Sequence, residues 1–128
     1  MELKLPCSVG DAFDRISILQ VKCENLTDEA KLAAVRAELN AVLESTHKAG
    51  LSCVVCDEHF ASLLEVNRAL WDIENGVRKA LRLKDDKLFL VHAKHVAPMN
   101  DRRASIKLAI NRKYDSALVE VKNHEGVQ

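Results

Sequence analysis

The feature that most constrains the fold is a long amphipathic pattern between residues 58 and 83. Apolar residues recur there every three or four positions, which is the spacing of one face of an α-helix. Three polar residues, Asn67, Glu74 and Arg78, fall inside the apolar arc. A buried charge is costly unless it is paired and hydrogen-bonded. The pattern therefore predicts one long helix whose polar stripe is an internal network, a subunit seam or a binding site.

The composition favours helices for the rest of the chain as well. Hydrophobic residues make up 48% of the 128 residues but aromatic residues only 4%, so Leu, Val and Ala must fill the core. Four glycines and two prolines are too few for the many turns of a β-sandwich. We predict a single all-α domain over residues 1–128, a bundle of about five helices.

Capping residues and periodicity predict where the first three helices begin and end. Ser8 is the expected N-cap of a first helix that runs to about residue 25. Thr27 is the expected N-cap of a second helix, which ends near Gly50. Asp57 is placed to cap the long third helix.

The second half of the chain predicts two further helices. A fourth runs from about residue 85 to 97, where Pro98 breaks or kinks it, and a fifth runs from about 100 to 113. Gly76 is assigned to the exposed side of the third helix. Alternating apolar residues predict a short two-stranded β-pair between residues 2–6 and 118–121.

The net charge is zero, yet the charges are unevenly distributed along the chain. Residues 1–75 contain seven basic and thirteen acidic residues, whereas residues 76–114 contain eleven basic and three acidic residues. A neutral total argues against bulk attraction to nucleic acid. The only aromatic residue near the basic helix is Tyr114, too little for base stacking. We expect the basic segment to pack against the acidic first half of the chain.

Polar residues on or beside apolar helix faces form the main candidate site. Glu74 and Arg78 are four residues apart, a spacing at which they can bond each other on one helix. If the helices converge, cations from other helices would line a pocket that suits a small dianion. The competing interpretation is a structural ion-pair network or a dimer seam. The candidate ligand-binding residues are Arg15, Lys22, Asn67, Trp71, Glu74, Arg78, Arg103 and Lys107.

A second candidate is a metal site in the connector before the third helix. Cys53, Cys56 and His59 form a C-x2-C-x2-H pattern, and the C-x2-C spacing fits structural zinc. A closed zinc site needs four ligands, however, and no clear second pair is present. We therefore expect no metal and no other cofactor, and keep a zinc-stabilised module as a lesser alternative. The same cysteine pair as a redox motif lacks a surrounding βαβ pattern.

Several signatures are missing from the sequence. It contains no G-x-S-x-G, Walker A, G-x-G-x-x-G or H-E-x-x-H motif, and Asp11 and Asp14 are interpreted as helix N-terminal acids. These absences favour a non-enzymatic module without deciding the matter. Residues 1–6 contain no signal-peptide pattern, and no stretch approaches the about 20 apolar residues of a membrane span. We expect a cytoplasmic protein with four reduced thiols.

Several stretches, spread in order over nearly the whole chain, match one known pattern: residues 8–11, 14–19 with Lys22, 31–39, 66–67, 70–74 with Arg78, 100–104 with Lys107, Ile110 and Asn111, and Ser116 with residues 118–122. Together they resemble an uncharacterised family of small helical proteins from bacteria and phages, known only as a domain of unknown function. The resemblance implies a helical fold and a frequent association with glycan or surface-polysaccharide genes, but no activity. This chain departs from the family pattern at Gly76, at Ala97 and Pro98, and in the Cys-rich connector.

These observations predict a helical module that binds a protein partner or self-assembles as a homo-oligomer. The alternative is a site for a small anion such as a sugar phosphate, a nucleotide sugar or a dicarboxylate. A catalytic version of that site would resemble an all-helical chorismate mutase, in which Arg and Lys from several helices clamp a dianion. Catalysis there is electrostatic and orientational, so it requires no nucleophile.

Overall fold

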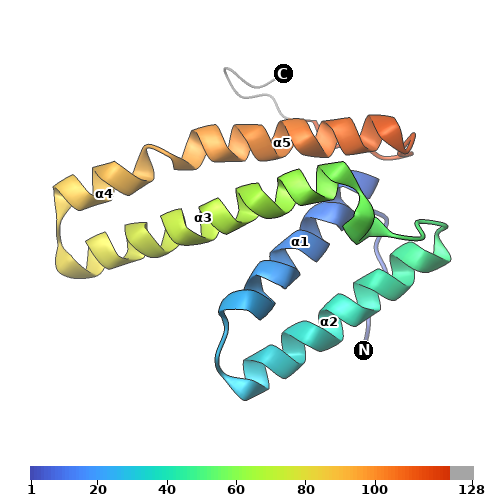
Figure 1. Cartoon of the computed structure of the whole chain (residues 1–128), viewed down its shortest axis with the longest axis horizontal. Coiled ribbons are helices and arrows are strands. Elements are labelled where there is room, and N and C mark those ends of the chain that lie inside the picture. Colours follow the sequence, from blue (N-terminus) through green and yellow to red (C-terminus); the bar gives the residue numbers. More distant parts are fainter. Residues whose placement is uncertain (122–128) are drawn as a thin grey trace.

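The computed structural model describes residues 1–121 and consists of helices joined by short connectors (Figure 1). The predicted all-α bundle is confirmed. No strand occurs within the described residues, so the predicted β-pair between residues 2–6 and 118–121 is wrong. The elements are α1 (Val9–Asn25), α2 (Glu29–Lys48), a 3-10 turn η1 (Val54–Cys56), α3 (Glu58–Leu83), α4 (Asp86–Ala93) and α5 (Val96–Lys113).

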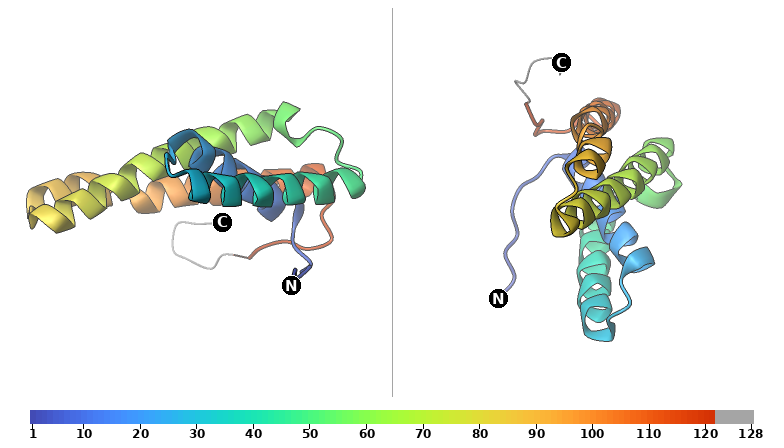
Figure 2. Two further views of the ribbon diagram at one scale, coloured as in Figure 1. Left: turned by 90° about the horizontal axis from the view of Figure 1, so that it is seen from below. Right: turned by 90° about the vertical axis from the view of Figure 1, so that its left-hand side faces the viewer.

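The helices form two hairpins, α1 with α2 and α3 with α4 and α5. α1 joins them, because it packs against both. α1 packs against α2, α3 and α5, whereas α3 packs against α1, α4 and α5. α4 and α5 follow one another and run back along α3, and α1 diverges from α3 towards its own C-terminus (Figure 1). The far end of the second hairpin is therefore built from α3 and α4 alone, as Figure 2 also shows. No helix of the described chain is both long and apolar enough to cross a membrane.

Side-chain caps fix the starts of the first three helices. The Ser8 hydroxyl accepts from the backbone N–H of Asp11, and the Asp57 carboxylate accepts from that of His59, as the sequence predicts. The cap of α2 is Asp28 rather than Thr27, and it accepts from the N–H of Lys31. A carboxylate at this position satisfies an otherwise unpaired N–H and interacts favourably with the helix dipole.

The boundary between α4 and α5 differs from the prediction. The break falls at residues 94–95, and Pro98 lies in the first turn of α5 instead of ending α4. Proline is tolerated in the first turn of a helix, because its missing N–H would have no intrahelical partner there. The predicted end of the fifth helix, near residue 113, agrees with the structure.

The core lies where α1, α3 and α5 meet. Its fully buried side chains include Phe13 and Ile16 from α1, Leu63 from α3 and Ile110 from α5. Val54 of the 3-10 turn belongs to the same cluster. The apolar residues of α2 are only half-buried, because α2 packs mainly on α1. The second hairpin and α1 therefore provide most of the tightly packed contacts.

Two glycines mark close approaches between helices. A Cβ on Gly10 would lie 2.6 Å from the Lys107 carbonyl oxygen, and the Gly10 N–H donates to the Asn111 side chain at 2.7 Å. A Cβ on Gly76 would lie 2.5 Å from the His92 ring. Gly76 is thus on the α4-facing side of α3, and its prediction as an exposed residue is wrong. Its missing side chain makes room for His92.

Candidate functional site

A buried polar network joins α1, α3 and α5 at the centre of the molecule. The Asp14 carboxylate accepts two hydrogen bonds from Arg103, at 2.8 and 2.5 Å. The Asn67 amide donates to Asp14 at 3.0 Å and to the Ser17 hydroxyl at 2.7 Å. Ser17 in turn donates to the Asp14 carbonyl oxygen. Asp14, Ser17 and Asn67 are buried, so this network is a well-paired structural centre.

The network corrects part of the sequence interpretation. Asn67 and Arg103 were predicted to share one site, and they bond the same carboxylate. Asp14, however, is not merely an acid near a helix terminus. It is the anion that neutralises Arg103, and the hydrogen bonds between them raise the pKa of Arg103. Asp14 shares a face of α1 with Ile18 and Val21, four and seven residues further on, and this shared face is the signal that could have identified it.

A pocket of about 480 Å³ opens directly beside this network, between α1, α3 and α5. Its walls combine apolar residues from α1 and α3 with three asparagines and three charged residues. Five of the eight candidate residues are in the wall. The complete lining is Ile18, Val21, Asn67, Leu70, Trp71, Glu74, Asn75, Arg78, Asn100 and Arg103.

Glu74 and Arg78 differ from the prediction in their environment. Both are exposed, although they continue the helix face on which Asn67 is buried. No ion pair joins Glu74 to Arg78, or either of them to another residue, within residues 1–121. Both side chains are exposed because α1 ends at Asn25 and diverges from α3 before it reaches this part of the helix (Figure 1).

The remaining candidate cations lie outside the pocket lining. Arg15 is exposed and pairs with Glu38 of α2 at 3.2 Å. Lys107 bridges Asp11 and Glu120 at 2.8 and 2.5 Å. Burial opposes the charge on Lys107, but the hydrogen bonds to these two carboxylates raise its pKa. The structure therefore does not bring these two cations into the predicted multi-cation cluster.

Lys22 is the third candidate outside the lining. It is half-buried one helical turn after Ile18, near the pocket but not in its wall. With Arg103 neutralised by Asp14, the pocket holds one cation, Arg78, without an acidic partner among the described residues. Glu74 balances its charge. The lining is thus close to neutral, which suits an apolar or zwitterionic surface better than a dianion.

The basic segment of the chain does pack against the acidic first half, as predicted. Arg103 pairs with Asp14, Lys107 with Asp11, and Lys113 with Asp57. Burial opposes the charge on Asp57, but hydrogen bonds from Lys113 and Tyr114 lower its pKa. These pairs join α5 to α1 and to the start of α3. Carboxylates of the first half thus neutralise part of the excess positive charge of residues 76–114.

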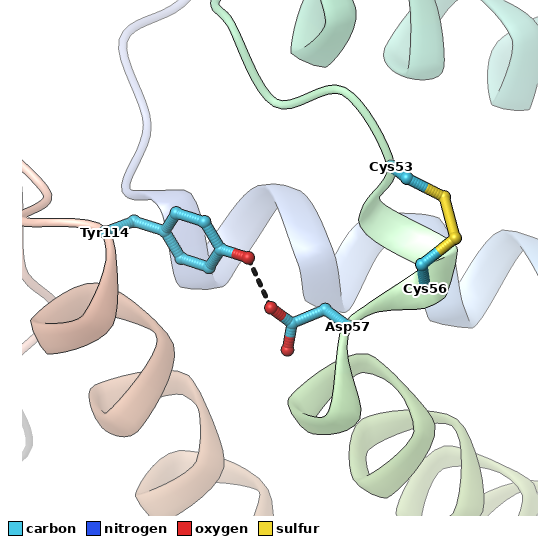
Figure 3. The surroundings of a disulfide bond; sticks show 4 residues. All are labelled: Cys53, Cys56, Asp57 and Tyr114. Atoms are coloured by element: carbon cyan, nitrogen blue, oxygen red, sulfur yellow. Dashed lines mark hydrogen bonds between the residues drawn. A yellow bond between two sulfur atoms is a disulfide. The ribbon is translucent and has the colours of Figure 1, made fainter.

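The Cys-rich connector holds a disulfide. Cys53 and Cys56 are bonded to each other across η1 (Figure 3), so the prediction of reduced thiols is wrong for this pair. Their Cα atoms are 5.4 Å apart, well within the range that a disulfide spans. Cys7 and Cys23 are free. No cluster of three or more His, Cys, Asp or Glu residues suited to a metal occurs in the described chain, and His59 forms none with the cysteines.

Comparisons of the chain with protein-family models, with curated proteins and with solved structures find no match. The resemblance to an uncharacterised helical family stays a prediction.

Proposed function

We propose that this chain is an assembly module that forms a two-fold dimer through the second half of α3. The observation that carries the proposal is the exposed pair Glu74 and Arg78, opposite charges that share one helix face and have no ion-pair partner within residues 1–121. A second copy of the same surface supplies the opposite charge for each of them. Electrostatic complementarity of this kind favours specific pairing and fixes its register.

The sequence of this face has the spacing of a coiled-coil seam. Asn67, Trp71, Glu74, Arg78 and Leu81 follow one another at intervals of four, three, four and three residues. This alternation is that of the a and d positions of a heptad repeat, which face a partner helix. α1 covers the first of these residues, and the later ones are left open. The open part is the surface that a second helix can occupy.

An antiparallel copy of α3 pairs this stripe with itself in a single register. When Glu74 faces Arg78 of the partner subunit, Trp71 faces Leu81 of the partner subunit, because both pairs are centred on Gly76. Each contact then occurs twice about the two-fold axis, as in any isologous interface. Charged residues meet opposite charges and apolar residues meet apolar residues. No shift of the chain is needed to satisfy both conditions.

The pocket offers a place for the leucine of the second copy. Leu81 is 60% exposed, although a Leu side chain gains about 1.5–3 kcal/mol when it is fully buried. The pocket wall beside Trp71 includes Ile18 and Leu70, which form an apolar surface of suitable chemistry. Trp71 in the pocket wall is itself one of the residue types that are enriched among the energetically dominant residues of interfaces.

The same pocket supports one alternative, the binding of a small anion. Arg78 is available for such a ligand, and Asn75 and Asn100 in the wall can hydrogen-bond its polar groups. The near-neutral lining favours the dimer, because Glu74 would repel an anion held by Arg78. Exchanging the charges of Glu74 and Arg78 distinguishes the two functions. The exchange keeps the dimer seam self-complementary, but it moves the cation that would bind an anionic ligand.

The experiment is analytical ultracentrifugation of the wild-type chain over a range of concentrations, together with three variants. Glu74→Arg and Arg78→Glu each place like charges across the seam, so we expect at least a tenfold weaker dimer, which is a change of about 1.4 kcal/mol. The double variant Glu74→Arg/Arg78→Glu restores opposite charges. We expect it to recover most of the wild-type association.

Two charge reversals on another face of α3 serve as controls. Asp72→Lys and Lys79→Glu change the net charge of the helix equally, and both residues are exposed. We expect them to leave the dimer intact. A wild-type chain that stays monomeric at the highest concentration, or a double variant as weak as the singles, would contradict the proposal. We also propose that the chain acts in the cytoplasm and that its partner is not a nucleic acid.

A further inference from the structure

The disulfide between Cys53 and Cys56 lies on the surface, immediately before α3. Both cysteine residues are exposed, whereas Val54 between them is only 4% exposed and packs into the core. The backbone N–H of Cys56 donates to the Cys53 carbonyl oxygen, and that of Asp57 donates to the Val54 carbonyl oxygen. The covalent bond and the 3-10 turn thus close the same short segment. Solvent reaches the cysteines while the turn remains anchored beneath them.

The residue after this turn joins two helices. One oxygen of the Asp57 carboxylate accepts from the N–H of His59 and thereby caps α3. The other accepts from the Tyr114 hydroxyl, as Figure 3 shows. It also accepts from the Lys113 ammonium group, at 2.7 Å. The carboxylate is nearly fully buried, with its side chain 2% exposed. Asp57 is therefore the clasp between the start of α3 and the end of α5.

The disulfide and the clasp are adjacent in the chain, so the backbone of the turn sets the position of Asp57. Opening the bond removes the covalent restraint from residues 53–56 and leaves only two backbone hydrogen bonds to close the turn, from Cys56 to Cys53 and from Asp57 to Val54. A C-x2-C pair with both residues exposed can also exchange with external thiols, since reaction requires access to one sulfur. Cys7 and Cys23 have no such pairing.

We propose that Cys53 and Cys56 form a reversible redox site, and that its oxidation state sets the rigidity of the Asp57 clasp between α3 and α5. The site is independent of the α3 seam and goes beyond the proposed assembly function. Its reaction partner is a glutathione-type thiol and disulfide couple. Exposed disulfides are the ones typically found in labile or regulatory roles.

The exchange balances as a two-electron reaction. The thiolate of the reductant attacks one cysteine sulfur, the bond between Cys53 and Cys56 breaks, and the released cysteine thiolate takes up a proton. A second reductant thiolate then attacks the mixed disulfide and releases the other cysteine. The products are two cysteine thiols and the disulfide of the reductant. Oxidation reverses these steps with glutathione disulfide as the electron acceptor.

The first test follows the redox state of the intact chain. The folded protein is equilibrated with mixtures of glutathione and glutathione disulfide, quenched in acid, alkylated and mapped by peptide mass. We expect the Cys53 and Cys56 peptide to change from mostly reduced to mostly intramolecular disulfide across these mixtures. A pair that stays oxidised in glutathione alone, stays reduced in glutathione disulfide alone, or forms only mixed disulfides overturns the proposal. The peptides of Cys7 and Cys23 are the internal comparison.

The second test measures the coupling to the clasp. Tyr114 is the only tyrosine in the chain, so its ring resonances in NMR report on the clasp without ambiguity. We expect these resonances to differ between the oxidised and reduced protein at neutral pH, and Cys53→Ser/Cys56→Ser to match the reduced form. Asp57→Asn should make the Tyr114 resonances insensitive to the redox state. Identical Tyr114 resonances in the oxidised and reduced wild-type chain overturn the coupling, even if exchange is reversible.

Discussion

The two halves of α3 have the same kind of sequence but different surroundings. In the first half, residues 58–70, the apolar face is covered by α1, and Leu63 and Val66 are almost fully buried. In the second half, residues 71–83, the same face continues with Glu74, Arg78 and Leu81, all of them exposed. The helix itself does not change at this point. The difference is that α1 ends.

This contrast explains how one polar stripe can have two roles. Asn67 is satisfied within the chain, because Asp14 and Ser17 lie opposite it on α1. Glu74 and Arg78 have the same periodic position but no ion-pair partner in the described chain, and both are exposed. A helix face that is patterned for burial and left open is typical of an interaction surface. Substitutions in the closed half should therefore destabilise the monomer, whereas substitutions on the open face should not.

The largest expected effect is at the centre of the closed half. Asp14→Ala leaves the Arg103 guanidinium and the Asn67 amide without their shared acceptor, and breaking a buried pair from one side costs about 3–5 kcal/mol. Urea denaturation measures the loss. The matched control is Glu38→Ala, which breaks the exposed pair with Arg15 and should cost less than about 1 kcal/mol. Equal losses for the two variants would contradict the buried network.

Two leucines on the same helix provide the next comparison. Leu63 is fully buried, so Leu63→Ala removes packing and leaves a cavity, at a cost of about 2–5 kcal/mol. Leu81→Ala should change the unfolding free energy by less than about 0.5 kcal/mol, because the side chain is 60% exposed. Denaturation is measured at a protein concentration at which the chain is monomeric. A large loss at Leu81 would place it in the core of the monomer and contradict the open seam.

Much of the fold follows from local sequence patterns. The bounds of the long helix agree with the prediction because periodicity extends without interruption from residue 58 to 83 and Asp57 caps it. Ser8 and Gly50 mark helix ends by the same local rules, and Gly50 has the positive φ expected there. These features depend on residues within one or two helical turns. They can be predicted without knowing which helices meet.

The features that the sequence analysis missed depend on tertiary neighbours. Gly76 was assigned to the exposed side, because the sequence does not reveal that His92 packs over it. Asp14 was interpreted as an acid near a helix start, because its partners Asn67 and Arg103 are distant in sequence. The spacing of Glu74 and Arg78 allows them to bond each other but does not reveal that both are exposed, because their exposure depends on where α1 ends. Periodicity identifies the face of a helix but not how far the neighbouring helix extends.

A pH-dependent prediction concerns the start of the closed half. The pKa of Asp57 is below its usual value of 3.8 in the folded chain, since the bonds from Lys113 and Tyr114 outweigh the opposing effect of burial. A depressed pKa stabilises the fold above the pKa of the unfolded chain, and this contribution is lost as the pH falls through the folded value. Asp57→Asn retains a good cap, so at neutral pH it should cost about 1 kcal/mol from the lost charged bonds.

The measurement is urea denaturation of the wild type and of Asp57→Asn from neutral pH to well below pH 3.8. The gap between the two chains should be constant at neutral pH and close in the acidic range. Glu38→Ala again serves as a control, because its exposed side chain should show a small gap throughout. A gap for Asp57→Asn that persists at the lowest pH would mean that the charge of Asp57 does not stabilise the clasp.

An effect of similar size is expected in the open half, where α3 meets α4. Gly76→Ala gains about 1 kcal/mol of helix propensity, but its Cβ would lie 2.5 Å from the His92 ring. Overpacking of this kind costs about 1–3 kcal/mol, so we expect a net loss of about 1 kcal/mol in thermal or urea denaturation. Adding His92→Ala should remove the clash and recover that loss. If Gly76→Ala alone is stabilising, the α4 helix is free to move away from α3.

The smallest effect on the monomer, and the most informative one, is at the exposed pair itself. Glu74→Ala and Arg78→Ala should each change the unfolding free energy by less than about 0.5 kcal/mol, because neither side chain has an ion-pair partner in the described chain. Sedimentation of the same variants should nevertheless show weaker association. Stability and association would then separate at the residue where α1 ceases to cover α3. A loss of several kcal/mol in the monomer would instead make Glu74 and Arg78 part of the closed half, and the seam would begin further along the helix.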